Sequence, residues 1–351
     1  MASSGYGGFD QLSSALAETF RPYVDDNVFG SNMVFQEGWD EAEKVDPGRF
    51  LALPIVSGKN QTAQAFGAFD EVNSSPQSTN SVAAFPWSFY QVAVTMDYQT
   101  LTLNRGPNVR INLIAEQLQI GIASISDVCG QDLCQFGAAT FGSKAGATPN
   151  GVPLFGIVEA TDDGTVDNVY GNIARTGAGS FVNWQGNDIR KLTTANIGLA
   201  ANDAPLSLFY ALYNNSTQGT AVPTHVFSSR QGVAAYMFAL QPQQRLSPGD
   251  IANAGFAGAY LFAARVLGDD HILNPISTGS ATGAIGCNFF AINMNHTRFF
   301  YPAQKGFDFI PWVEAQSRVA RTSRYVTGLQ FCSSQPRTGG LLTNVNSTSN
   351  L

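Results

Sequence analysis

A long polar stretch between two strand-like segments is the feature of this sequence that most restricts its fold. Residues 49–56 (RFLALPIV) form an apolar run typical of a β-strand, and residues 85–96 (FPWSFYQVAVTM) alternate with a period of two. Residues 57–84 between them are rich in Gly, Ser, Asn, Gln and Ala. Because a compact domain rarely contains so long a structureless loop, we expect a hairpin that projects toward another molecule.

An apolar stripe after this hairpin predicts one long helix. Pro107 is suited to the first helical turn, and apolar residues then recur at three- and four-residue steps. The stripe consists of Ile111, Ile114, Leu118, Ile122, Ile125, Cys129 and Leu133. A helix over 107–135 would be on the order of 40 Å long at about 1.5 Å per residue.

The middle of the chain indicates an α+β architecture. Residues 187–288 alternate candidate helices, at 188–201 and 229–240, with short strand-like runs. Further strand-like segments follow, including 289–292 and 318–329.

The charge is concentrated at the N-terminus. Residues 1–48 hold nine acids and two bases, whereas the remainder holds seventeen of each sign, so the net charge of −7 belongs to this segment. A neutral body with an acidic arm lacks the basic footprint of a nucleic-acid reader. We therefore expect no sequence-specific binding to DNA.

No recognisable catalytic or metal-binding motif is present. The sequence has no G-x-S-x-G, Walker A or dinucleotide fingerprint, and its three histidines (His225, His271 and His296) lack metal-ligand spacing. An acidic segment, Asp162 to Asp167, lacks the EF-hand pattern and is better explained as a turn. We expect no enzyme activity, cofactor or metal. A hydrolase using Cys129, Cys134 or Cys287 is the alternative from a different class.

Cysteine usage and hydropathy indicate where the chain folds. Four cysteines in 351 residues do not make a disulfide framework, so we expect free thiols. No apolar run approaches the roughly 18 to 20 residues of a membrane span, and residues 1–10 do not resemble a signal peptide. We expect folding in a reducing cytoplasm, away from membranes.

Three arginines near the C-terminus are a candidate contact site. Arg318, Arg321 and Arg324 lie on a candidate strand or short helix. They form either a solvated face or a dock for an acidic partner segment, such as the arm of a neighbouring subunit.

Residues 45–340 resemble the major capsid proteins of tailed bacteriophages, the Hong Kong 97-like family. The similar segments keep the family's order along the chain. They are VSGKNQTAQAFGAFDEVNSSPQ, FPWSFYQVAVTMDYQTLTLNRG, NVRINLIAEQLQIGIASISD, GVPLFGIVEATDDGTVDNVYGNIAR with FVNW, VPTHVFSSRQGVAAYMFALQPQQR and CNFFAINMNHTRFFY. Departures occur in the Gly-rich connector around 137–151 and at residues 163–165.

The resemblance implies an α+β Hong Kong 97-like capsid fold with five parts. These are an N-terminal arm (1–48), an extended β-hairpin loop (49–98), a peripheral domain (99–186) with the spine helix 107–135, an axial domain (187–288), and closing strands of the peripheral domain with a C-terminal tail (289–351).

It also implies where subunits meet. We expect the arm, with Trp39, Glu41 and Glu43, to reach a neighbour's basic surface at Arg318, Arg321 or Arg324. We expect the hairpin tip, with Phe66, Phe69 and Asp70, to lie on an adjacent peripheral domain. Gln244 and Arg245 are expected near the capsomer axis.

The implied function is structural. The chain would assemble with itself into pentamers and hexamers of an icosahedral virion head in the bacterial cytoplasm. Its partners would be scaffold, portal or decoration proteins, and it would enclose double-stranded DNA. Lys59 lies near the base of the hairpin and is its only lysine, so we expect no isopeptide cross-link. An encapsulin-type shell protein is the alternative within the same fold, and a decoration or fibre protein is another.

Overall fold

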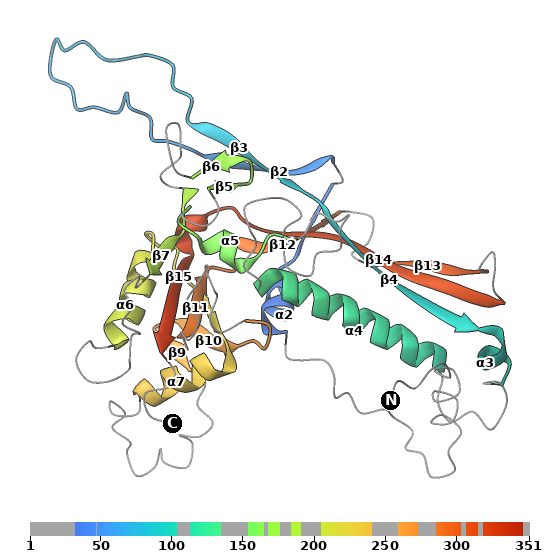
Figure 1. The fold of residues 1–351 in the computed structure, drawn as a ribbon. Helices are drawn as coiled ribbons and strands as arrows, with labels where there is room; N and C mark the ends of the chain where they lie inside the picture. Colours follow the sequence, from blue (N-terminus) through green and yellow to red (C-terminus); the bar gives the residue numbers. More distant parts are fainter. Residues whose placement is uncertain are drawn as a thin grey trace.

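The computed structural model describes residues 32–46, 48–103, 113–134, 154–164, 168–175, 184–190, 205–240, 259–272, 286–302, 307–314 and 319–346. They form two units and a projecting loop (Figure 1). We name them after the predicted domains. The sheet of β1, β4 and β12 to β14 with helix α4 is called the peripheral unit, and the sheet of β7 to β11 and β15 with helices α6 and α7 is called the axial unit.

The peripheral unit is built around the long strand β14 (Ala320–Ser333). Most of β14 pairs antiparallel with β4 (Ser88–Asp97) and with β13 (Phe307–Glu314). Its last residues pair with β12 (Thr297–Pro302), beside which β1 (Glu43–Val45) runs parallel. The strand is partly exposed at its start and buried over its last seven residues. It therefore connects an outlying sheet to the centre of the molecule.

Helix α4 (Leu113–Cys134) lies along one face of this sheet (Figure 1). Ile125, Cys129 and Leu133 are buried as predicted, because residues spaced by four share a helix face. The prediction for Ile122 is wrong, since its side chain is 41% exposed. Gly121 faces β4 at this level instead: a Cβ there would lie 3.4 Å from the side chains of Val92 and Val94. The remaining predicted helical residues, 107–112 and 135, lie outside the described residues.

The axial unit is a six-stranded sheet that carries two helices. The strand order is β7 (Asn187–Arg190), β15 (Gly340–Asn346), β11 (Gly286–Ile292), β8 (His225–Ser228), β10 (Ala264–Gly268) and β9 (Tyr260–Leu261). Helices α6 (Pro205–Asn215) and α7 (Arg230–Leu240) contribute Phe209, Leu212 and Tyr236 to the apolar core on one face.

Two sequence predictions are corrected in this sheet. The division that assigned 289–351 to the peripheral domain is wrong for β15 and most of β11, which pair within the axial sheet. The candidate helix 188–201 begins as strand β7, and 191–204 lie outside the described residues. Alternating hydropathy predicts a strand but not its partner, so sheet membership could not be assigned.

The projecting loop begins as a regular hairpin. Strands β2 (Phe50–Val56) and β3 (Asn80–Pro86) pair antiparallel, with Val56 opposite Asn80, and residues 57–79 extend beyond them without a helix or strand (Figure 1). The hairpin pairing ends at Pro86. The strand that follows, β4, pairs with β14, so the hairpin is shorter than the predicted 49–98.

A small hairpin supports the base of this loop. Strands β5 (Val169–Tyr170) and β6 (Ile173–Ala174) are joined by Gly171 and Asn172, and the Gly171 carbonyl accepts a hydrogen bond from the Ala84 amide. Gly171 has φ +58°, and a Cβ there would lie 2.6 Å from the Phe85 ring. Only glycine fits this position.

The two units share one apolar core. Helix α2 (Met33–Asp40) and helix α5 (Ile157–Thr161) lie in it together with buried residues of α4, β11, β12 and β14. Two short helices complete the described elements, α3 (Tyr98–Leu103) and the 3-10 helix η3 (Pro336–Thr338).

Candidate subunit interfaces

The predicted arm contacts lie at the root of the arm and pack on their own chain. Trp39 stacks on Phe35 and on Tyr301, with ring centroids 5.7 and 5.8 Å apart. Glu43, in β1, forms an ion pair with Arg298 at 3.3 Å, and Glu41 is exposed after the last turn of α2. Residues 33–45 therefore pack as part of the subunit's own fold, with Val34 and Phe35 in its core. A contact between these side chains and a neighbour stays a prediction.

The tip of the extended loop exposes apolar side chains. Phe66 is 72% exposed, Val72 is 57% exposed, and Phe69 is as exposed as in an isolated peptide, at 105%. Phe69 also has φ +78°, a strained conformation for a bulky residue. Asp70 closes a turn, because its carboxylate accepts a hydrogen bond from the Gly67 amide. The predicted tip residues thus form one local structure that holds two phenylalanine rings in solvent.

The predicted basic group does not form one patch. Arg321 and Arg324 are three residues apart on β14, so they point to opposite faces of the sheet. Arg321 pairs with Glu314 at 3.2 Å, and Arg318 lies outside the described residues. The sequence did not decide between a strand and a short helix for these residues. They lie in a strand, which places the Arg321 and Arg324 side chains on opposite faces.

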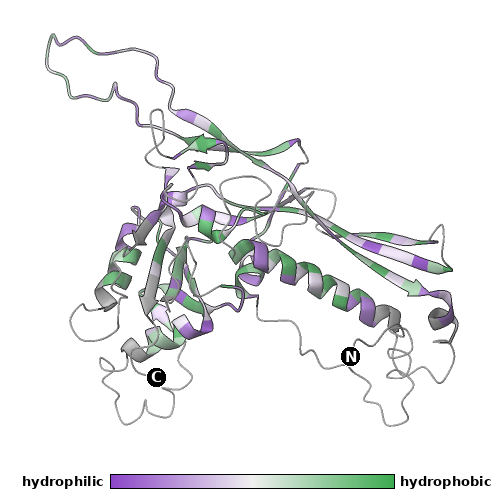
Figure 2. Ribbon diagram, in the orientation of Figure 1, coloured by the Kyte–Doolittle hydropathy of each residue, from purple (hydrophilic) through white to green (hydrophobic). Residues whose placement is uncertain are grey.

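Arg324 instead lies on an open face of the peripheral sheet, which mixes apolar side chains with polar ones such as Gln91 and Thr95. By register, it shares this face with Ala93 and Ile310. Phe89 and Val313 lie on the same side, and they are 67% and 60% exposed. The other side of β4 packs toward α4 through Val94 and Met96. Figure 2 shows the corresponding alternation of hydrophobic and hydrophilic residues along these strands. We call Phe89, Ala93, Ile310, Val313 and Arg324 the open sheet face.

The period-two pattern of 85–96 predicted that Phe89 lies on the opposite side of the strand from Val92 and Val94. It did not indicate that Phe89 is left uncovered by the elements that the structure describes.

An aromatic cluster on the axial unit was not predicted. Phe262, in the turn between β9 and β10, has φ +54° and lies against Tyr210 and Tyr213, with ring centroids 5.3 and 4.7 Å away. Phe262 is 58% exposed. The predicted axial residues Gln244 and Arg245 lie outside the described residues.

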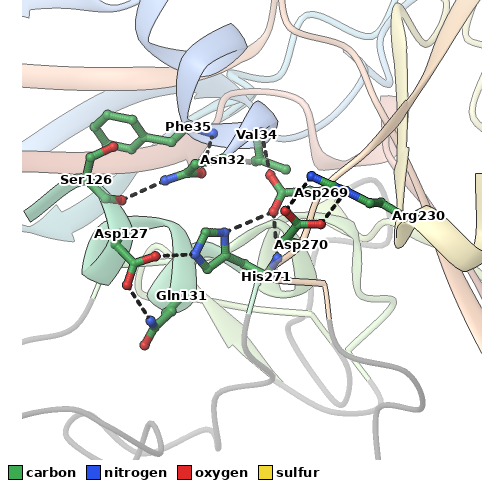
Figure 3. A network of polar contacts seen from close by, with 10 residues as sticks. All are labelled: Asn32, Val34, Phe35, Ser126, Asp127, Gln131, Arg230, Asp269, Asp270 and His271. Atoms are coloured by element: carbon green, nitrogen blue, oxygen red, sulfur yellow. Dashed lines mark hydrogen bonds and ion pairs between the residues drawn. The ribbon is translucent and has the colours of Figure 1, made fainter. Parts of the chain in front are cut away.

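A polar network joins the two units at α2 (Figure 3). The Asn32 side chain donates to the Ser126 carbonyl of α4 at 2.7 Å, and the Val34 amide donates to Asp269 Oδ2, after β10, at 2.9 Å. His271 lies between Asp269 and Asp127 of α4. Hydrogen bonding to Asp269 and Asp127 raises the pKa of His271 to about 9, against an opposing effect of burial. No local sequence pattern indicated this network, since its members are far apart along the chain.

The close approach of α2 to α4 depends on a glycine. A Cβ at Gly130 would lie 2.3 Å from the Asn32 side-chain nitrogen. We expect Gly130→Ala to displace Asn32, whose side chain also accepts the Phe35 amide and so caps α2. The free energy of unfolding should fall by about 1–2 kcal/mol. Urea unfolding of the unassembled subunit measures this. Gly58→Ala is the control, because a Cβ there meets nothing within 4 Å; equal stabilities of the two variants would contradict the prediction.

The described residues give little support to catalysis. All four cysteines are buried, and burial raises the pKa of Cys129 and of Cys332. A buried thiol that holds its proton is a poor nucleophile. The described ranges contain no group of three or more metal-ligating side chains. None of the helices in the described part of the chain combines the length and hydropathy needed to cross a bilayer.

No protein-family model and no curated protein matches the sequence, but solved structures do. The Cyanophage A-1(L) capsid matches with a TM-score of 0.63 at 9% identity, over 95% of this chain and 99% of that one. The capsid of a native gene transfer agent particle matches with a TM-score of 0.56 at 12% identity, over 97% and 98% of the chains. This chain has the Hong Kong 97-like capsid fold.

An encapsulin matches this fold as well. The SrpI encapsulin from Synechococcus elongatus PCC 7942 matches with a TM-score of 0.56 at 12% identity, over 97% of each chain. The likeness therefore includes both phage-type capsids and an encapsulin, and the predicted fold is confirmed.

Proposed function

We propose that the chain is the major capsid protein of a tailed bacteriophage. It assembles in the host cytoplasm into pentamers and hexamers of an icosahedral head that encloses double-stranded DNA. Scaffold, portal or decoration proteins are its further partners. The proposal makes it a structural protein, and the capsid fold of its structural neighbours supports this.

One observation carries the proposal. The extended loop holds Phe66 and Phe69 in solvent, away from the subunit's own core. A monomeric protein gains nothing from such a projection, whereas a shell subunit needs segments that overlap its neighbours. The open sheet face, which exposes Phe89 and Val313, offers apolar side chains to the loop of an adjacent copy.

The test is expression of the full chain, alone and together with the genes that flank it, followed by negative-stain electron microscopy. We expect closed icosahedral shells. Monodisperse monomers under every condition would overturn the proposal. The encapsulin alternative, favoured by the match to SrpI, predicts shells that contain a protein cargo in place of DNA.

The arm gives a more specific expectation. Removal of residues 1–31 spares α2, so the subunit should stay folded. Its assembly into shells should be impaired, because the arm is then missing. Removal of residues 1–40 should also destabilise the subunit, since Val34 and Phe35 are buried in the shared core. Electron microscopy and thermal unfolding measure the two effects. Normal shells from the shorter deletion would show that the arm is not an assembly element.

A further inference from the structure

Three segments that are distant in sequence meet around one histidine (Figure 3). His271 follows β10 of the axial unit, and its Nε2 lies 2.8 Å from Asp127 Oδ1 of α4. Its Nδ1 lies 3.1 Å from Asp269 Oδ1, while the other Asp269 oxygen accepts the Val34 amide of α2. The ring therefore links the axial unit to α4 directly and to α2 through one carboxylate.

The geometry requires two N–H donors on this ring. An ionised carboxylate only accepts hydrogen bonds, and a neutral imidazole has one N–H. Both contacts are satisfied together only when His271 is an imidazolium. The Asp269 side chain is fully buried, that of His271 is 8% exposed and that of Asp127 is 27% exposed, so water can hardly replace a partner that Asp269 loses.

The neighbouring charged groups have partners of their own. Asp270 pairs with Arg230 of α7 at 2.6 Å, and on α4 the Asp132 carboxylate accepts from the Tyr90 hydroxyl. Glu37 of α2 faces Arg265 and His225. The Gln131 amide donates to the second oxygen of Asp127. His271 is thus the cation placed between Asp127 and Asp269.

We propose that His271 is a protonation-controlled clamp that holds the axial unit against α4 and the root of the arm. Loss of its proton releases one of the two carboxylates and loosens α2. The clamp is a property of the single subunit and does not depend on shell formation.

The pH window follows from the pKa. The folded-state pKa of about 9 is above the ordinary value of 6.5, so protonation favours the folded arrangement. The stabilisation is fully present below about 6.5 and is lost as the pH rises through about 9.

The test uses the unassembled full-length chain with isotopically labelled histidine, followed by NMR as a function of pH. We expect the His271 ring to titrate near pH 9. In Asp127→Asn, which keeps the shape but removes one charge, its midpoint should fall by about one unit or more. A His271 midpoint at or below 6.5, or one unchanged in Asp127→Asn, would overturn the proposal.

Hydrogen exchange gives the structural readout. At neutral pH, His271→Gln should accelerate exchange of the α2 amides, Val34 among them, by about tenfold or more, because Asp269 loses its cationic partner. His296→Gln is the matched control, since His296 lies outside this network. If His271→Gln does not fold, the same measurement is made on Asp127→Asn. Equal exchange in variant and control would refute the clamp.

Discussion

Shortening the extended loop should abolish shell assembly and leave the subunit folded. Ser57 and Gly58 donate their amides to the Thr79 carbonyl, so residues 59–77 can be replaced by Asn-Gly, a two-residue turn that suits antiparallel strands. The change removes Phe66 and Phe69 and keeps the β2–β3 pairing. Electron microscopy measures assembly, and circular dichroism with thermal unfolding measures folding.

Point variants test the physical cause. Burial of a Phe side chain contributes about 1.5–3 kcal/mol, so Phe66→Ser with Phe69→Ser should weaken each loop contact by about 3–6 kcal/mol, on the order of 10² to 10⁴ in association constant. Gln77→Ser is the control, because it changes an exposed polar residue of the same loop. Unimpaired shells from the double Phe variant would exclude the tip as a contact.

The partner surface can be tested in the same system. If the loop docks on the open sheet face, Val313→Ser should also impair assembly, and its effect should not add to that of Phe69→Ser. Additive effects would place the loop on another surface.

Local patterns predicted the elements of this fold. They did not predict how the elements pair, because that depends on contacts between distant segments. The stripe through Ile125, Cys129 and Leu133 predicted α4, and the long polar stretch predicted the projecting loop. Strand hydropathy could not show that β11 and β15 lie in the axial sheet, because pairing depends on segments far apart in sequence.

The candidate contact residues also divide into those that a local pattern predicts and those whose environment depends on long-range contacts. Phe66 and Phe69 were predicted to be available to a neighbour, and both are exposed. Trp39 lies against Tyr301 in its own subunit, a contact between α2 and β12 that no local pattern encodes. Whether Arg321 and Arg324 form one patch depends on the element that carries them. A helix would place them on one face, whereas strand β14 places them on opposite faces.

A buried ion pair near the base of the loop should have the largest effect on stability. Arg175 and Asp162 are both fully buried, with Nη1 3.7 Å from Oδ2. The guanidinium also donates to the Glu159 carbonyl and lies 4.5 Å from the centre of the Tyr170 ring. Tyr170 and Gly171 support the loop through β3, so Arg175 positions the base of the loop.

We expect Arg175→Met to lower the free energy of unfolding by about 3–5 kcal/mol, because Asp162 then loses its cationic partner in the interior. Urea unfolding of the unassembled subunit measures this. Arg321→Met is the matched control: its pair with Glu314 is exposed, and such pairs contribute about 0–1 kcal/mol. Adding Asp162→Asn to Arg175→Met should recover part of the loss, since the unpaired charge of Asp162 is then removed from the interior. A loss as small as that of the control would show that the ion pair does not stabilise the loop base.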